Sequence, residues 1–321
     1  MTKRYVGIDL GGTNLKLGLV SASGHMVERL SSPTEAARGP DHVLGRMAEA
    51  VRDICKLAGI PLTDVAAVGV GAPGPLDTKA GKVVFAPNMP GWRNIMVRDT
   101  LHRNLGRPVV VENDANVAGY GEFRCGAAPD VRDMVILTLG TGVGGGIILD
   151  GRMFRGRTDT GAELGHLIVH HGGRKCGCGN LGCLEAYASA TAVVARFGEA
   201  LAAGEESLLA SEEDFSCKDI FEAAAKGDAL SVRIVDETAD YLADGIISLL
   251  HVLNPQEVVL TGGMMGAGDG FLDRIRTRVR TMAFERAAQA CEVRWSTLGG
   301  DAGILGAALA AEAFDRTGQP A

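Results

Sequence analysis

One histidine and three cysteines stand close together in the sequence and could bind a metal ion. His166 is followed by Cys176, Cys178 and Cys183. One imidazole and three thiolates form a usual ligand set for tetrahedral Zn²⁺. Because four protein ligands fill the coordination sphere, the pattern predicts a structural zinc site rather than a hydrolytic one. Glycines beside the cysteines would let the thiolates converge.

Two carboxylates flank this metal cluster. Glu163 precedes His166 by three positions, and Glu185 follows Cys183 by two. A zinc loop would hold both side chains rigidly, which suits them to accept hydrogen bonds from sugar hydroxyls. The alternative is that both are solvated surface charges, the common state of glutamate.

A glycine turn near the start of the chain could bind phosphate together with its metal ion. Asp9 ends an apolar run and is followed by Gly11, Gly12 and Thr13. Glycines let backbone N–H groups approach an anion, and the acid could position a cation. An ordinary Gly-Gly hairpin turn explains the same residues about equally well.

A second glycine turn makes phosphate binding the better interpretation. Thr138, Gly140, Thr141 and Gly142 offer hydroxyls and open backbone amides, and the run continues to Gly146. Its glycines formally match the dinucleotide fingerprint G-x-G-x-x-G, but that fingerprint requires a helix to begin inside it. Here the sequence continues as a strand, so we predict a strand–turn–strand phosphate grip. Gly262 and Gly263 follow another strand, where a nucleotide could lie, although a plain βα loop fits equally well.

One acidic segment could supply a general base. The β-branched run 109–111 ends at Glu112, Asn113 and Asp114. A carboxylate at a strand end beside a glycine-lined cleft can accept a hydroxyl proton. Alternatively, Asp114 caps the helix expected from about residue 115, since aspartate is a preferred N-cap.

The elements that must position these residues alternate between strands and helices, which indicates an α/β protein. Strands are expected at 5–9, 15–20, 26–30, 65–70, 108–111, 134–139, 146–150, 257–260 and 292–296. Helices are expected at 41–57, 95–105, 229–253, 270–284 and 301–314.

Composition narrows the functional classes. The 321 residues include 45 glycines and 46% apolar residues, with a net charge of −7 and 5% aromatic residues. The charge and the scarcity of aromatic side chains disfavour nucleic-acid binding. No secretory signal and no membrane span are apparent, so a cytoplasmic location is expected. The glycine clusters at 11–12, 71–74, 136–182 and 262–270 are expected to mark approaches of the backbone to ligands.

Five ordered motifs together resemble the ROK family (repressor, open reading frame, kinase), and within it the bacterial ATP-dependent glucokinases. The motifs are Asp9 to Thr13, Glu112 to Asn116, Leu139 to Gly146, Glu163 to His166 and Cys176 to Glu185. The resemblance implies the actin-like, ribonuclease H-like sugar-kinase fold, with two α/β domains closing on a cleft. The expected small domain spans 1–117 plus a C-terminal helix of about 300–321, and the large domain, with the zinc loop, spans 118–299.

The resemblance also implies a role for each motif in MgATP-dependent phosphorylation of a hexose 6-hydroxyl. Asp114 would be the general base. The implied sugar-binding residues are Gly74, Asn88, Asn113, Asp114, Glu163, His166 and Glu185. Asp9 would position Mg²⁺, and the implied nucleotide-binding residues are Gly11, Gly12, Thr13, Thr138, Gly140, Thr141, Gly142, Gly262 and Gly263. His166 would bind zinc through one ring nitrogen and face the sugar with the other.

Several alternatives stay open at this point. The implied substrate is D-glucose, but mannose, fructose, N-acetylglucosamine and N-acetylmannosamine kinases share these motifs, and the segment 77–93 is expected to bear on the sugar 2-position. Polyphosphate could replace ATP as donor. The family also contains repressors with an added helix-turn-helix segment, for which we expect no room before residue 5. A homodimer or homotetramer is expected.

Overall fold

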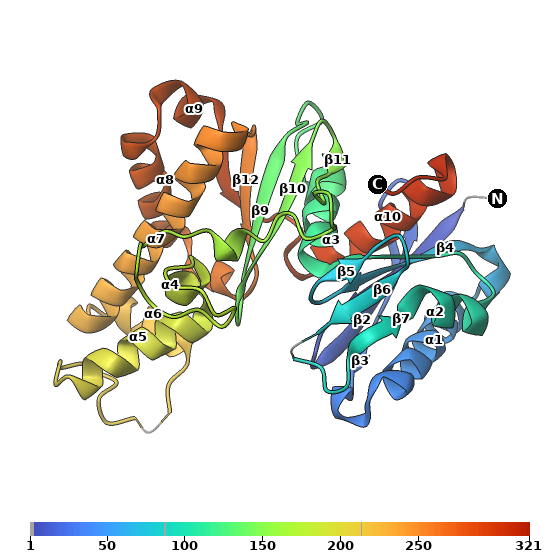
Figure 1. Cartoon of the computed structure of the whole chain (residues 1–321), viewed down its shortest axis with the longest axis horizontal. Helices are drawn as coiled ribbons and strands as arrows, with labels where there is room; N and C mark the ends of the chain where they lie inside the picture. Colours follow the sequence, from blue (N-terminus) through green and yellow to red (C-terminus); the bar gives the residue numbers. More distant parts are fainter. Residues whose placement is uncertain (1–2, 87, 213) are drawn as a thin grey trace. The chain divides into compact units, whose positions relative to one another are not determined.

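The computed structural model describes residues 3–86, 88–212 and 214–321. The chain forms two compact units (Figure 1). The first unit comprises Met1–Arg132, Gly146–Ala162 and Thr297–Ala321, and the second comprises Asp133–Gly145 and Glu163–Ser296. This division differs from the expected one because residues 118–132 and 146–162 belong to the first unit.

The first unit is built on a five-stranded sheet with the order β3-β2-β1-β4-β8. Its strands are β1 (Arg4–Leu10), β2 (Asn14–Ser21), β3 (Met26–Pro33), β4 (Val65–Ala72) and β8 (Val109–Asn113). β1, β2 and β3 pair antiparallel, whereas β1, β4 and β8 run parallel. The apolar runs predicted as strands are therefore confirmed here. Most of their ends extend by one to three residues, and the last strand begins one residue later than predicted, at Val109.

Helices cover both faces of this sheet because the side chains along each strand alternate between the faces. Val6 and Ile8 lie in the core shared with α1 (Pro40–Leu57) and α2 (Val97–Leu105), whereas Tyr5 packs with α10 (Ala302–Thr317). The short helix α3 (Asp114–Gly121) also packs against α10 (Figure 1). The predicted helix 95–105 begins later, at Val97, because residues 93–96 form a strand.

Glycines allow α10 to approach the sheet and α3 closely. A Cβ added at Gly69 would lie 1.8 Å from the carbonyl oxygen of Ala307, and one at Gly306 would lie 1.6 Å from that of Val117. These positions exclude any larger side chain. Both glycines lie outside the clusters that are expected to mark ligand approaches, and they serve helix packing instead.

A small three-stranded sheet lies in the segment predicted only as a loop near residues 77–93. Its strands are β5 (Leu76–Asp77), β6 (Lys82–Phe85) and β7 (Arg93–Met96), in that order. Leu76, Val83 and Trp92 are buried in the core of the first unit. Burial of these apolar side chains explains why the segment is structured. Residue 87 lies outside the described residues.

The second sheet has the order β11-β10-β9-β12-β13. Its strands are β9 (Met134–Leu139), β10 (Val143–Leu149), β11 (Arg152–Met153), β12 (Glu257–Thr261) and β13 (Glu292–Trp295). β9, β12 and β13 run parallel. The strand expected from residue 146 begins at Val143, so the turn that precedes it is shorter than predicted.

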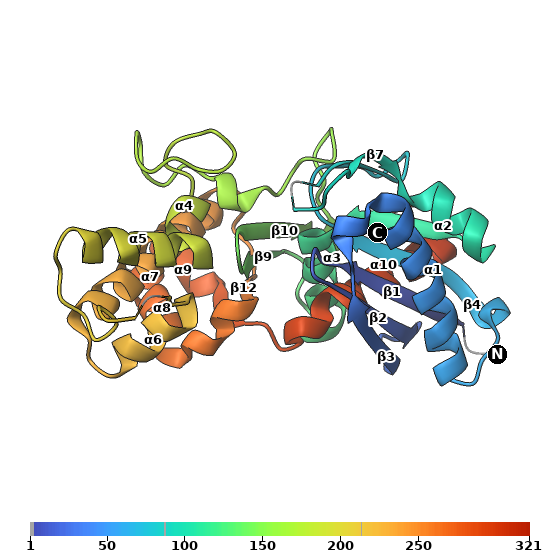
Figure 2. The ribbon, with the colours of Figure 1, turned by 90° about the horizontal axis from the view of Figure 1, so that it is seen from below.

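Helices of the second unit pack around the long helix α7 (Figures 1 and 2). They are α4 (Glu185–Ala188), α5 (Ala190–Ala202), α6 (Cys217–Ala225), α7 (Ala229–Leu253), α8 (Asp269–Met282) and α9 (Glu285–Ala290). Along the described residues, no helix combines the length and the apolar character that crossing a bilayer requires.

Candidate active site

Three parallel strands of the first unit bring Asp9, Asn113 and Asp114 to one edge of the sheet. Asp9 in β1 is paired with Gly71 in β4, and the next residue of β4, Ala72, is paired with Asn113 in β8. A Cβ added at Gly71 would lie 3.5 Å from the Cα of Asp114. Ligands of open α/β sheets bind at this carboxyl edge, so the location fits a reaction centre.

The helix after β8 is capped by Asn113, not by Asp114. The Oδ1 of Asn113 accepts hydrogen bonds from the backbone N–H groups of Ala115 and Asn116, at 3.0 and 3.1 Å. Asp114 is the first residue of α3, and its Oδ1 accepts from Ala115 N at 2.8 Å. Because Asn113 supplies the cap, the capping alternative for Asp114 is wrong. The positive end of α3 stabilises the Asp114 carboxylate.

Asp9 is a half-buried carboxylate beside the first glycine turn. Burial raises the pKa of the Asp9 carboxyl, and the charge of Lys16 opposes this rise. A Cβ at Gly303 would lie 3.5 Å from the Asp9 Cγ, so the carboxylate lies against the first turn of α10. An oxygen ligand beside glycines suits Mg²⁺ with phosphate.

The first glycine turn lies next to the segment that carries Asn88. Gly11 N donates to Asn14 O at 3.1 Å, and Thr13 O accepts from Thr34 N at 2.8 Å. A Cβ at Gly12 would lie 3.5 Å from the backbone oxygen of Asn88. The first unit therefore gathers Asp9, the turn 11–13 and Asn88.

Gly74 follows β4 and requires its glycine. Its φ is 83°, and a Cβ would lie 2.1 Å from Phe85 O. Any other residue would push β6 away from the segment after β4. Gly74 thus allows β6 of the small sheet to lie close to the segment that follows β4.

The four predicted metal ligands meet in the second unit. Their ligand atoms all lie within 4.8 Å of one another. The Sγ atoms of Cys178 and Cys183 are 3.7 Å apart, and the Cys176 Sγ lies 3.7 Å from the Nδ1 of His166. Zinc–sulfur bonds of about 2.3 Å at tetrahedral angles imply a sulfur–sulfur separation of about 3.8 Å. The donor set and its spacing therefore fit Zn²⁺.

The local structure explains how these cysteines converge. Cys176 N donates to Asn180 O at 2.9 Å, and Gly182 N donates to Arg174 O at 2.8 Å, which folds the loop back on itself. Burial raises the pKa of the Cys176 thiol to about 12. Zinc would deprotonate this thiol on binding, because coordination stabilises the thiolate.

Glu185 connects the metal cluster to the second glycine turn. One of its carboxylate oxygens accepts a hydrogen bond from Val143 N at 3.0 Å, and the other lies 3.6 Å from the Cys176 Sγ. The surface-charge alternative for Glu185 is therefore wrong. Glu163 is exposed, and its carbonyl oxygen accepts from His166 N at 3.0 Å.

The second glycine turn is held by the helices that follow the zinc loop. Gly140 O accepts from Ala190 N at 2.9 Å, and Thr141 O accepts from the Thr191 hydroxyl at 2.9 Å. In the parallel pair of β9 and β12, Thr138 is paired in register with Thr261. The segments after these two strands therefore leave the sheet at the same edge.

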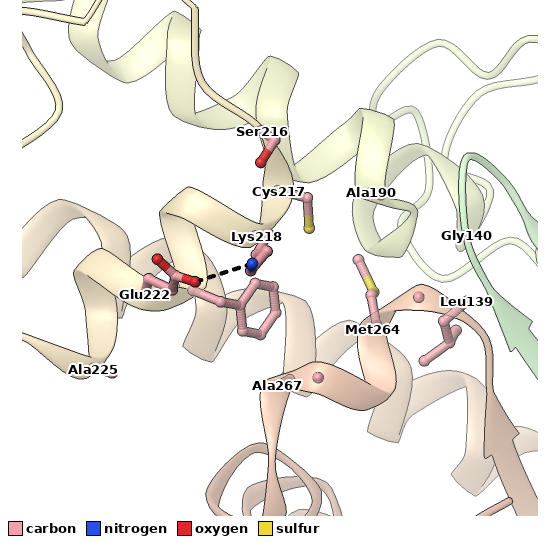
Figure 3. Close-up of a pocket in the computed structure, with 13 residues that line it drawn as sticks. Leu139, Gly140, Ala190, Ser216, Cys217, Lys218, Glu222, Ala225, Met264 and Ala267 are labelled. Carbon is pink, nitrogen blue, oxygen red and sulfur yellow. Dashed lines mark ion pairs between the residues drawn. The ribbon is translucent and has the colours of Figure 1, made fainter. Parts of the chain in front are cut away.

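A cavity of about 530 Å³ opens beside the second glycine turn within the second unit (Figure 3). Gly140 and Gly263 line it, whereas Gly262 is not among the lining residues. A Cβ at Gly262 would lie 2.4 Å from Leu139 O, so this glycine instead lets the two strand ends approach. The cavity has the size and the mainly apolar walls of a small-molecule site.

One wall of this cavity comes from α6 and was not predicted as part of the site. The wall residues are Ser216, Cys217, Lys218, Phe221, Glu222 and Ala225. Phe221 is supported by an edge-to-face contact with Phe271, with ring centroids 5.2 Å apart. In the sequence of α6, no residue pattern signals a ligand. The remaining lining residues are Leu139, Ala190, Met264, Gly266 and Ala267.

Comparison with known proteins identifies the family. The family model described as ROK family matches residues 5–313. The chain belongs to the ROK family. A ROK family glucokinase from Streptomyces griseus, solved in complex with glucose and AMPPNP, superposes with a TM-score of 0.80 at 36% identity, covering 95% of this chain and 98% of that one. The ROK chain described here therefore has the expected actin-like α/β fold.

Two proteins named glucokinase are similar to this chain over nearly their full lengths. The glucokinase of Thermotoga maritima is 38% identical over 95% of this chain and 96% of its own length. The glucokinase of Halalkalibacterium halodurans is 37% identical over 94% of this chain and 93% of its own length. The resemblance that the sequence motifs indicate is thus confirmed over nearly the whole chain.

Proposed function

We propose that this ROK protein transfers the γ-phosphoryl group of MgATP to the 6-hydroxyl of D-glucose, giving glucose 6-phosphate and ADP. The observation that carries the proposal is the placement of Asp114 and Asp9 at one edge of the first sheet. The similarity to glucokinases, one of them solved with glucose and an ATP analogue, supports glucose and ATP as the pair of substrates.

Asp114 is the proposed general base. Its carboxylate accepts the proton of the sugar 6-hydroxyl as the hydroxyl oxygen bonds to the γ-phosphorus, and the bond from that phosphorus to the bridging oxygen of ADP breaks. In phosphoryl transfer, positioning and charge neutralisation supply most of the acceleration. The cap formed by Asn113 serves this positioning because it fixes the start of α3, where Asp114 stands.

The proposed phosphate and metal residues lie in the two glycine turns. Asp9 would hold Mg²⁺, which when bound neutralises negative charge on the phosphates. Backbone N–H groups of the turns would bind the phosphates, and the cavity beside Gly140 and Gly263 would take the adenine. Phe221 and Met264 give that cavity apolar walls suited to a flat heterocycle.

The proposed sugar site includes the zinc loop. Its residues are Gly74, Asn88, Asn113, Asp114, Glu163, His166 and Glu185. The geometry supports a double role for His166, since Nδ1 is the nitrogen that faces Cys176 and Nε2 remains for a sugar hydroxyl. Zinc would fix the loop without taking part in the transfer.

An ADP-release assay with a panel of hexoses and N-acetylhexosamines tests the function. We expect the highest kcat/KM with D-glucose and ATP, and the product should be phosphorylated at the 6-position. A clear preference for an N-acetylated sugar would reject glucose as the substrate. Replacing ATP by polyphosphate in the same assay tests the donor. The cytoplasmic location and the homo-oligomeric state stay predictions.

A further inference from the structure

A buried ion pair lies directly beside the proposed base and takes no part in the chemistry described so far. Glu112 immediately precedes Asn113 and Asp114 at the end of β8. The Nε of Arg155 donates to the Glu112 Oε1 at 2.7 Å, and the Nη2 of Arg155 lies 2.7 Å from the same oxygen. The Glu112 side chain is 2% exposed and that of Arg155 is 15% exposed.

Arg155 is what makes a charge at Glu112 tolerable. Burial raises the pKa of the Glu112 carboxyl, and the charge and hydrogen bond of Arg155 oppose this rise. The second carboxylate oxygen, Oε2, has no hydrogen-bond partner among the described residues. Without Arg155, Glu112 would be a buried carboxylate lacking its compensating charge, which proteins avoid by moving or protonating the group.

The pair holds the end of β8 from one face of the sheet. Val109 and Val111 point into the core that contains α1 and α2. Side chains alternate along a strand, so Glu112 leaves β8 on the other face. The strand end is therefore fixed by apolar packing on one face and by Arg155 on the other.

Arg155 is itself anchored independently of Glu112. It begins a loop that is closed by a hydrogen bond from Gly161 N to Arg155 O at 2.9 Å. Within this loop, Asp159 accepts hydrogen bonds from the backbone N and the hydroxyl of Thr78, at 3.0 and 2.9 Å. Because Asp159 ties the loop to Thr78, the loop can set the position of Glu112 rather than follow it.

We propose that Arg155 is a positioning residue, which holds Asn113 and Asp114 in place for proton transfer by clamping Glu112. This inference rests on the proposed hexose kinase activity. Loss of Arg155 is expected to change kcat rather than nucleotide binding, because the cavity proposed for adenine is built only from residues of the second unit, whereas Arg155 belongs to the first.

The test compares Arg155→Met with a matched break of a second buried pair. Arg294 and Glu257 form an ion pair at 2.6 Å in the second unit, with side chains 12% and 6% exposed. We expect Arg155→Met to lower kcat by about 10- to 100-fold, since small misplacements of reacting groups have effects of this size. Its KM for ATP should stay within about twofold of the wild-type value. Arg294→Met should lower Tm while kcat stays near the wild-type value.

A conservative variant separates positioning from general stability. Arg155→Lys keeps the charge near Glu112, so its kcat should lie between those of the wild type and Arg155→Met. If Arg155→Met does not fold, Arg155→Gln, which keeps a hydrogen-bond donor, is judged by the same criterion. A kcat within about twofold of wild type together with a Tm loss like that of Arg294→Met would overturn the inference. Wild-type protein that phosphorylates no hexose would instead reject the proposed function.

Discussion

At the scale of single residues, the proposed base is defined by its neighbours. Asn113 occupies the capping position of α3, and the helix begins at Asp114 with its positive end toward the carboxylate. Capping of α3 is thus a function of Asn113, and Asp114 keeps its proposed role as the base. This arrangement leads to a direct test.

Asp114→Ala should lower kcat by about 10²- to 10⁴-fold, the range assigned to general acid–base catalysis. Steady-state kinetics with glucose and ATP measures the loss. Asp114→Asn serves as the control, because it keeps the shape and removes the basic oxygen. An unchanged kcat in either variant would remove Asp114 from the role of base.

A second residue-scale prediction concerns the zinc loop. Cys178→Ser should remove zinc and raise the KM for glucose together, because Glu185 and His166 are positioned by the same loop. Metal analysis and glucose kinetics measure the two effects. Cys125→Ser, at an exposed cysteine outside the cluster, should change neither. Full zinc content combined with weak glucose binding would contradict the coupling.

At the scale of elements, the ends of the helices depend on specific side chains. Asp228 caps α7 and is buried. Its carboxylate accepts from Ser231 N at 2.9 Å, Leu208 N at 2.8 Å and the Ser207 hydroxyl at 2.9 Å. Burial alone would raise the pKa of Asp228, but these hydrogen bonds hold it below its ordinary value.

Asp228→Ala should reduce the free energy of unfolding by about 1–3 kcal/mol at pH 7. Because the folded pKa is depressed, the stabilisation is complete above the unfolded pKa of about 3.9 and is lost as the pH falls through the lower folded value. Urea unfolding at pH 7 and pH 3 measures this. Asp228→Asn, which keeps an acceptor without the charge, should show a weaker pH dependence. Equal pH dependence in wild type and Asp228→Asn would contradict the assignment.

The packing of α10 gives a second prediction for an element. Gly306→Ala should destabilise the protein by about 3 kcal/mol or more, since its Cβ would overlap Val117 O. Gly45 lies in the middle of α1 with open space around it, so Gly45→Ala should instead stabilise by about 0.5–1 kcal/mol. Thermal unfolding compares the two. Equal effects of the two substitutions would mean that α10 is not packed as described.

At the scale of the whole molecule, charge favours an enzyme over a DNA-binding regulator. The net charge is −7 and the sequence pI is about 5.6. Such a chain lacks the positive field that phosphate backbones require. The ROK family nevertheless contains repressors, so the alternative calls for a measurement.

We expect no binding to duplex DNA at physiological salt, with or without glucose. Fluorescence polarisation with a labelled duplex measures this, and the ADP-release assay on the same preparation shows that the protein is active. Salt-dependent DNA binding without sugar-dependent ADP release would reverse the choice between enzyme and regulator.

The sequence alone determined the features that are local. The predicted zinc ligands lie within one short segment, and their residue types and spacing were sufficient to predict that they converge. The position of Asp114 at the carboxyl edge of the sheet was predictable because a polar residue at the end of a β-branched run marks this edge. The order of the motifs was likewise enough to indicate the family, because each motif carries its own chemistry.

Only the tertiary structure decided which distant residues support these motifs. Arg155 meets Glu112 across 43 positions of sequence, and an arginine in a loop carries no sign of its partner. The α6 wall of the cavity is built from side chains that belong to no recognisable sequence motif. Gly69 lies in a predicted strand and Gly306 in a predicted helix, and neither position signals that it permits helix packing, because the need for a missing Cβ depends on an element far along the chain. Each motif consists of residues that are neighbours in the sequence, so its chemistry can be predicted from the sequence. The residues that support the motifs are brought to them by the packing of the folded chain.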